Sequence, residues 1–292
     1  DFGVSGIWKA VFHSVSAFCN AGFDLMGTPD TPFVSLTAYR ADPVINLTIS
    51  ALIVVGGIGF LTWDDVRTNR LCFHRYRLQS KVILTATALL ILLPTLFFFC
   101  FEFKGGTLRE RLLLSLFQSV TPRTAGFNTA DYTSLSGSGR GLTILLMFIG
   151  GSPGSTAGGI KTTTAAVLVA NAFAVFRRQK SPEMFGRRME EKAVYDAAAI
   201  FTLYLVLSLT GAFVIGTVEG LPLSECLFET TSAIATVGLS LGLTPHLGIV
   251  SQGILIFLMF IGRVGGLTMI YAALSGSKSS AARLPQERIT VG

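Results

Sequence analysis

The chain has 292 residues, of which 50% are hydrophobic and only 14% are charged, and its formal net charge is +6. Soluble domains carry roughly 25% charged residues, and disordered chains carry few apolar ones, so this composition excludes both classes. The four cysteines have neither the spacing of a zinc site nor that of a redox pair. The composition therefore predicts an all-α integral membrane protein.

Charge-free stretches long enough to cross a bilayer recur along the chain. A spanning helix needs about 20 apolar residues. Residues 43–63, 82–101 and 197–218 reach that length without a charge, and residues 247–277 contain a single charge, Arg263. We expect each of these four stretches to be a span.

A fifth apolar stretch, residues 141–176, contains one charge and is too long for one straight span. At about 1.5 Å per residue it would greatly exceed the roughly 30 Å of the hydrocarbon core. Its middle, residues 150–159, is rich in Gly and Ser and holds a Pro, so it cannot form a regular helix. We expect a broken span whose irregular part lies inside protein or along a wet path.

Three shorter apolar stretches lie beside these spans and favour re-entrant half-helices. They cover residues 10–23, 112–122 and 226–238. Three copies of one pattern align here, each leading from a Phe in the stretch to a Gly: Phe12 to Gly22, Phe117 to Gly126 and Phe228 to Gly238.

An internal repeat follows from this alignment. The sequence Met-Phe-Ile-Gly ends 24 residues after Gly126 and again 24 residues after Gly238, whereas a longer connection leads from Gly22 to Gly56. The predicted unit is span, half-helix, glycine-centred turn and span. Two units are complete, and we expect the leading span of the first to belong to residues upstream of this sequence.

Lys and Arg residues predict the orientation of the spans. Residues 64–81 hold five, residues 177–192 hold six and the tail after residue 277 holds three, which places all three segments on the cytoplasmic side. The opposite side holds more acids than bases, and a negative outer mouth would concentrate cations. Alternatively, the acids there are a by-product of the positive-inside bias.

The three glycines predict an ion filter. A half-helix that ends in Gly at membrane depth turns peptide carbonyls toward a shared axis, and a ring of carbonyls replaces the hydration shell of a cation. The third copy reads Thr236-Val237-Gly238, as in the first three letters of a potassium channel filter. One Gly per copy predicts a single strong ring. The alternative is that these glycines allow close helix packing.

The irregular residues 150–159 predict a flexible intramembrane gate, with a simple helix kink as the alternative. Residues 154–162 nearly match a phosphate-binding loop, but Ile160 intrudes before Lys161 and no strand precedes it. Arg263 at membrane depth predicts an electrostatic barrier in the ion path, and a packing role is compatible with it. We expect His13 to pack behind the filter, since the histidines form no metal or proton-relay pattern.

These residues resemble the ion-translocating subunits of bacterial Ktr potassium uptake systems (KtrB), within the Trk/Ktr/HKT superfamily. The resemblance is carried by residues 12–23, 117–128, 147–161, 236–239 and 259–263, and by the tail 283–292. It implies four span–pore-loop–span units around a pseudo-fourfold pore, of which the N-terminal one is missing here. We expect the second repeat in residues 1–75, the third in 76–185, the fourth in 186–277 and a cytoplasmic tail in 278–292.

The resemblance also assigns site residues. The filter would be formed by Asn20, Ala21, Gly22, Thr124, Ala125, Gly126, Thr236, Val237 and Gly238. The gate would be formed by Gly150, Gly151, Ser152, Gly154, Ser155, Gly158, Gly159 and Arg263.

The function predicted from the resemblance is potassium uptake without a covalent reaction, in the inner membrane of a bacterial cell. The transported ion would be K⁺, with Na⁺ as a stimulating ion, and there would be no covalent cofactor, no other metal and no nucleic acid. The partners would be a second copy in a homodimer, an octameric cytoplasmic ring of a nucleotide-binding regulator of the KtrA type, and the lipid bilayer. The alternatives are an uncoupled gated channel for monovalent cations and an intramembrane enzyme or sensor with a pore-like fold.

Overall fold

The computed structural model describes residues 3–28, 31, 33–70, 72–179 and 181–265. These residues are mostly helical, as predicted, and their one sheet is a hairpin in which β1 (Glu183–Met184) pairs antiparallel with β2 (Arg187–Arg188). The α-helices are α1 (Val4–Phe18), α2 (Pro43–Gly57), α3 (Phe60–Asn69), α4 (Leu78–Phe97), α5 (Leu108–Val120), α6 (Gly137–Phe148), α7 (Thr162–Phe176), α8 (Glu191–Glu219), α9 (Leu223–Ile234) and α10 (Ile249–Val264).

Two helices of the described part are long and apolar enough to cross a membrane unaided. They are α8 and α4, and a π-helical turn (Phe98–Glu102) extends α4. The predicted spans 82–101 and 197–218 are therefore confirmed as long helices. α8 ends before Gly220, whose φ of 68° lies in the left-handed region that favours Gly at a helix end.

The predicted span over residues 43–63 is not one straight helix, although its two helices together are long and apolar enough to cross a membrane. α2 ends at Gly57, and α3 continues from Phe60 at an angle of 97° to it. Gly59 makes this elbow with a φ of 87°, and a β-carbon there would lie 2.5 Å from the carbonyl oxygen of Pro153. The bend is therefore a product of tertiary contact, which a charge-free sequence does not reveal.

The break predicted within residues 141–176 is confirmed. α6 ends at Phe148 and α7 begins at Thr162, with irregular chain between them. The two ends of this chain are close, because the Gly150 N–H donates to the Ile160 carbonyl at 2.8 Å. Within the predicted span 247–277, α10 covers Ile249–Val264. The end of that span and the predicted tail 278–292 lie outside the described residues.

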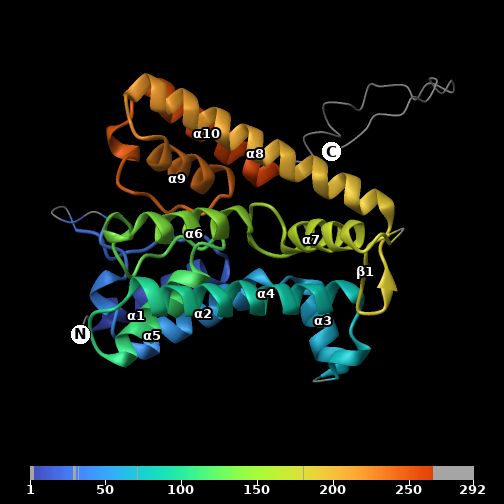
Figure 1. Ribbon diagram of the computed structural model, residues 1–292. Helices are drawn as coiled ribbons and strands as arrows, with labels where there is room; N and C mark the ends of the chain where they lie inside the picture. The colour runs from blue at the N-terminus through green and yellow to red at the C-terminus, as the bar shows by residue number, and fades with distance from the viewer. Residues whose placement is uncertain (1–2, 29–30, 32, 71, 180, 266–292) are drawn as a thin grey trace.

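Short helices overlap the three stretches predicted to be half-helices: they are α1, α5 and α9, of 15, 13 and 12 residues. Helices of this length fall short of a bilayer core of roughly 30 Å. Each packs on neighbouring helices: α1 on α2, α5 on α4, and α9 between α8 and α10. In Figure 1, α8 and α10 lie above α6 and α7, and α1, α2, α4 and α5 form the layer below.

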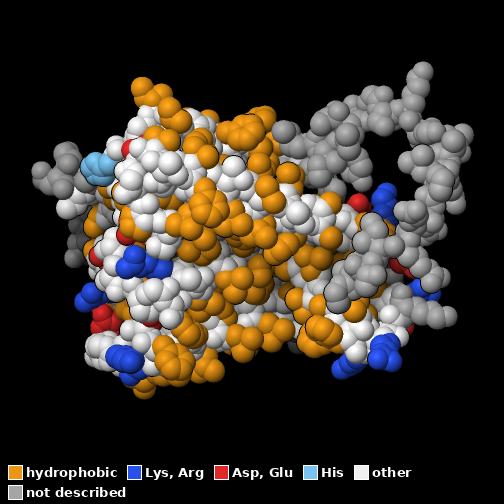
Figure 2. All heavy atoms as spheres, turned by 45° about the horizontal axis from the view of Figure 1, so that its top comes forward, with side chains coloured by type: hydrophobic (Ala, Val, Ile, Leu, Met, Phe, Trp, Pro, Cys, Tyr) orange, Lys and Arg blue, Asp and Glu red, His pale blue; other side chains and the backbone are white. Residues whose placement is uncertain are grey.

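Apolar and charged side chains occupy different parts of the surface. Figure 2 shows hydrophobic side chains across the middle of the molecule, whereas Lys, Arg, Asp and Glu gather toward its two ends. The exposed apolar residues include Leu92 and Leu93 on α4 and Phe213 on α8. Such a belt, flanked by charge, is what a surface immersed in lipid requires.

Candidate functional site

Three glycine turns follow α1, α5 and α9, and they share one backbone pattern. We call residues 20–22, 124–126 and 236–238 the glycine turns. In each, the first and third residues have positive φ: Asn20 (49°) and Gly22 (72°), Thr124 (69°) and Gly126 (86°), Thr236 (55°) and Gly238 (86°). A threonine in this region is strained, and strain of this kind gathers at functional sites.

Backbone hydrogen bonds close the first and third turns in the same way. The N–H of Ala21 donates to the Ser16 carbonyl at 2.9 Å, and that of Val237 donates to the Ser232 carbonyl at 2.9 Å. The middle turn is one residue shorter, and there Ala125 N–H donates to the Thr121 carbonyl at 3.0 Å. The repeat read from the sequence thus has a counterpart in backbone geometry.

The three turns lie edge to edge. A β-carbon on Gly22 would collide with the carbonyl oxygen of Ala125, and one on Gly126 would collide with that of Val237. Only Gly permits this approach of backbone to backbone. Around Gly238, by contrast, no atom of the described residues lies within 4 Å of such a β-carbon. The arrangement brings the backbones of the three turns together without side chains between them.

The glycine-rich segment, residues 150–159, touches the first residue of each turn. Asn20 Nδ2 donates to Thr156 Oγ1 at 3.0 Å. A β-carbon on Gly150 would lie 3.0 Å from Thr124 Cγ2, and one on Gly158 would collide with Thr236 Oγ1. The segment therefore lies directly against all three turns, and its glycines are required by that closeness.

The elbow between α2 and α3 anchors the glycine-rich segment. Ser152 N–H donates to the Gly57 carbonyl at 2.9 Å, and Phe60 N–H donates to the Gly154 carbonyl at 3.0 Å. A third link runs from Thr156 Oγ1 to the Gly56 carbonyl at 3.2 Å. The segment is thus held from the elbow on one side and from the turns on the other.

Two cations bind carbonyls of this segment. Arg263 Nη1 donates to the Thr156 carbonyl at 3.3 Å, and Lys161 Nζ donates to the Ala157 carbonyl at 2.7 Å. The packing role considered for Arg263 is therefore present in the structure. Arg263 is also exposed, so most of its charge faces open space beside the segment.

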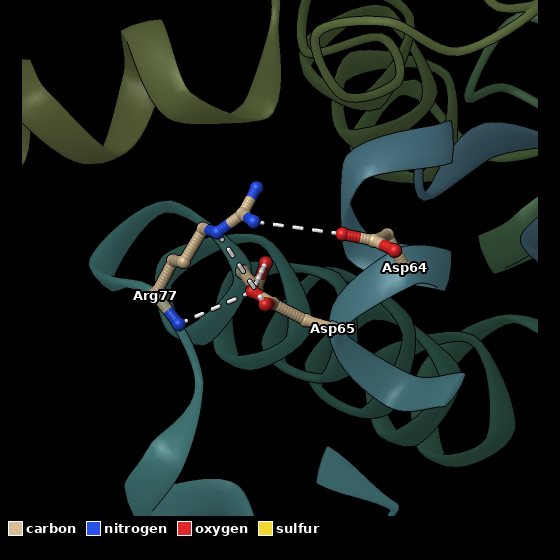
Figure 3. A network of polar contacts seen from close by, with 4 residues as sticks. Asp64, Asp65 and Arg77 are labelled. Atoms are coloured by element: carbon tan, nitrogen blue, oxygen red, sulfur yellow. Dashed lines mark hydrogen bonds and ion pairs between the residues drawn. The ribbon is translucent and has the colours of Figure 1, made fainter. Parts of the chain in front are cut away.

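A polar network that the sequence analysis did not single out fixes α3 to α4. In Figure 3, Arg77 lies against Asp64 and Asp65: its backbone N–H donates to Asp65 Oδ2 at 3.1 Å, and its guanidinium lies 3.5 Å from Asp64. Ser80 Oγ also donates to Asp65. Asp65 is only 3% exposed. The available signal was the adjacent acid pair directly after a charge-free stretch.

All the filter and gate residues predicted from the sequence lie in the described part of the chain, and the structure brings them together in one place. Among the described residues, no group of three or more His, Cys, Asp or Glu side chains is placed to hold a metal ion.

Comparison with known proteins places this arrangement in context. A family model described as "Cation transport protein" (TrkH) matches residues 1–108 and 102–281. The potassium/sodium uptake protein NtpJ of Enterococcus hirae is 41% identical over all of this chain and 66% of its own length. The Ktr system potassium uptake protein B of Bacillus subtilis is 39% identical over 99% of this chain and 64% of its own length.

A solved structure has the same fold. The crystal structure of the potassium transporter TrkH from Vibrio parahaemolyticus aligns with a TM-score of 0.74 at 19% identity, covering 91% of this chain and 58% of that one. The chain thus spans about two-thirds of the length of the curated relatives reported above.

Proposed function

The chain belongs to the TrkH family of cation transport proteins and is a multi-pass membrane protein, and from that premise we propose that it forms part of the ion path of a potassium uptake transporter. It carries out no covalent reaction in this proposal. The names of the two curated relatives, which take up potassium or potassium and sodium, support K⁺ as the transported ion.

The observation that carries the proposal is the edge-to-edge contact of the glycine turns. It brings the backbones of three separate segments together, and in this proposal their carbonyl oxygens replace water around a dehydrated cation. In this proposal the filter consists of Asn20, Ala21, Gly22, Thr124, Ala125, Gly126, Thr236, Val237 and Gly238. A fourth segment, placed between the open side of Gly238 and Gly22, completes the ring.

The glycine-rich segment is the proposed gate, with Arg263 beside it. It touches the first residue of every turn, so an ion leaving the turns meets it next. The repeat units proposed for this path are residues 1–75, 76–185 and 186–277, followed by a tail at 278–292.

We propose further that the protein is a homodimer and binds a cytoplasmic octameric ring of a nucleotide-binding regulator, with uptake stimulated by Na⁺. The support is the resemblance to Ktr subunits and the name of the Bacillus subtilis relative, which is one component of a system. The basic segment 177–192 would face such a partner.

Rubidium uptake by the full-length protein in cells that lack their own potassium uptake tests the proposal. We expect wild-type protein to restore uptake and Gly126→Ser to reduce its rate and selectivity, because Gly126 has a φ of 86° and abuts Val237. Gly137→Ala is the control, since a β-carbon there meets no described atom within 4 Å. If Gly126→Ser behaved as wild type, the filter assignment would be wrong. No uptake by the wild type would favour a sensor.

A further inference from the structure

One side chain stands at the same place behind each glycine turn. It directly follows the first Phe of each copy and is His13 on α1, Gln118 on α5 and Glu229 on α9. All three side chains are buried, with 7%, 0% and 4% of their surface exposed. Polar groups are not buried at one repeated position without a partner or a cost.

Glu229 is fully engaged by the chain that leaves the third turn. Its Oε1 accepts from Ser240 Oγ at 2.7 Å and from Leu241 N–H at 2.8 Å. Its Oε2 accepts from Thr244 Oγ1 at 2.8 Å. Hydrogen bonds to a carboxylate are stronger than neutral ones, and three of them here connect α9 to the outgoing side of the turn.

His13 makes the matching contact in the first copy. Its Nδ1 lies 2.6 Å from the Lys9 carbonyl, which can only accept, so Nδ1 carries the proton. Nε2 is then free to accept, and Leu25 N–H donates to it at 3.3 Å. Leu25 is three residues after Gly22, as Leu241 is three after Gly238. Two different side chains, His13 and Glu229, therefore accept a hydrogen bond from the equivalent backbone N–H of their own copies.

The middle copy departs from this pattern. Neither amide atom of Gln118 has a hydrogen-bond partner among the described residues. The middle turn is held by Thr121 Oγ1, which donates to the Phe127 carbonyl at 2.6 Å, a contact that the first turn also has, from Ser16 Oγ to the Phe23 carbonyl at 2.8 Å. The contact from the position after Phe is thus specific to the first and third turns.

We propose that Glu229 is a positioning residue for ion selection, because its carboxylate holds residues 240–244 and thereby fixes the carbonyls of the Gly238 turn. This inference rests on the proposed role of the glycine turns as a filter. A carbonyl ring discriminates between cations through the number and spacing of its oxygens, and a turn free to move keeps neither. Glu229 itself touches no ion.

Two variants separate the positioning role of Glu229 from the effect of its negative charge. Glu229→Gln keeps an acceptor for Ser240 and Leu241, and Thr244 can rotate to accept from its amide. Glu229→Leu removes every hydrogen bond at similar volume. Glu225→Gln, one turn earlier on α9, is the matched control for loss of charge.

The measurement is the ratio of Rb⁺ to Na⁺ uptake by full-length protein, with folding checked by size-exclusion chromatography. We expect about a tenfold fall in this ratio for Glu229→Leu, the scale of one charge-assisted hydrogen bond, and a change within about twofold for the two Gln variants. A folded Glu229→Leu with the wild-type ratio would overturn the inference. So would a Glu229→Gln that loses as much as Leu, since charge alone would then be responsible.

If Glu229→Leu does not fold, the double variant Ser240→Ala with Thr244→Val decides, because it removes two donors and leaves Glu229 in place. A lowered ratio supports the inference, and an unchanged ratio overturns it. A wild-type protein that moves no Rb⁺ overturns the proposed function and this inference with it. If Gly126→Ser lowers the rate and selectivity of uptake but the Glu229 variants have no effect on the ratio, this inference alone is overturned.

Discussion

Gly262 on α10 lies directly against the carbonyl oxygen of Ile234, the last residue of α9, and a β-carbon at Gly262 would collide with it. Gly56 on α2 stands in the same relation to Phe18, the last residue of α1. In the first and third copies, a glycine of the helix after the turn thus packs against the last residue of the short helix before it. Gly56 and Gly262 serve close packing without a positive φ, whereas Gly22 and Gly126 combine a positive φ with a close backbone approach.

Replacing Gly262 by Ala should therefore destabilise the protein by roughly 1–3 kcal/mol, because backbone must move to admit the methyl group. Gly253→Ala on the same helix is the control: a β-carbon there meets no described atom within 4 Å, and Ala is the better helix former. Thermal unfolding followed by size-exclusion chromatography measures both. Equal stability of the two variants would show that the close approach at Gly262 is relaxed at no cost.

Thr156 links the glycine-rich segment to the first turn and to the elbow. Its hydroxyl accepts from Asn20 Nδ2 and lies 3.1 and 3.2 Å from the carbonyls of Phe18 and Gly56. Thr156→Val keeps the shape and removes these hydrogen bonds, each worth about 1 kcal/mol. If the segment is a gate, Rb⁺ uptake should rise, by up to about tenfold for about 1.4 kcal/mol. Thr156→Ser should stay near wild type, and a Val variant with wild-type uptake would argue against the gate.

The glycine positions and the broken span could be predicted from the sequence, because Gly and Pro act locally on the backbone. The repeat spacing also located Gly262, but it did not distinguish a packing glycine from a filter glycine. The elbow at Gly59 and the contact of Thr156 with Asn20 were not predictable. Both depend on segments about a hundred residues apart, and no local pattern at Gly59 or Asn20 records them.

Replacing Arg263 should separate its two roles. The structure gives it one hydrogen bond, to the Thr156 carbonyl, and no acidic partner among the described residues. A charge held so loosely acts mainly through its field. We expect Arg263→Ala and Arg263→Gln both to raise Rb⁺ uptake, measured at equal surface expression. If only Ala raised it, the side chain would act as an anchor for the segment, because Gln retains a donor.

The network at the elbow gives a stability prediction with a built-in control. Asp65 is 3% exposed and accepts from Arg77 N–H and Ser80, whereas the side chain of Asp64 is 60% exposed and meets Arg77 only at 3.5 Å. Asp65→Ala should cost about 2–3 kcal/mol, since it leaves the donors of Arg77 and Ser80 unpaired. Asp64→Ala should cost under about 1 kcal/mol, as expected of an exposed ion pair, and less still in high salt. Thermal unfolding at low and high salt distinguishes the two.

Because the elbow also holds the glycine-rich segment through Gly57 and Phe60, Asp65→Ala should raise Rb⁺ uptake as well, whereas Asp64→Ala should leave it unchanged.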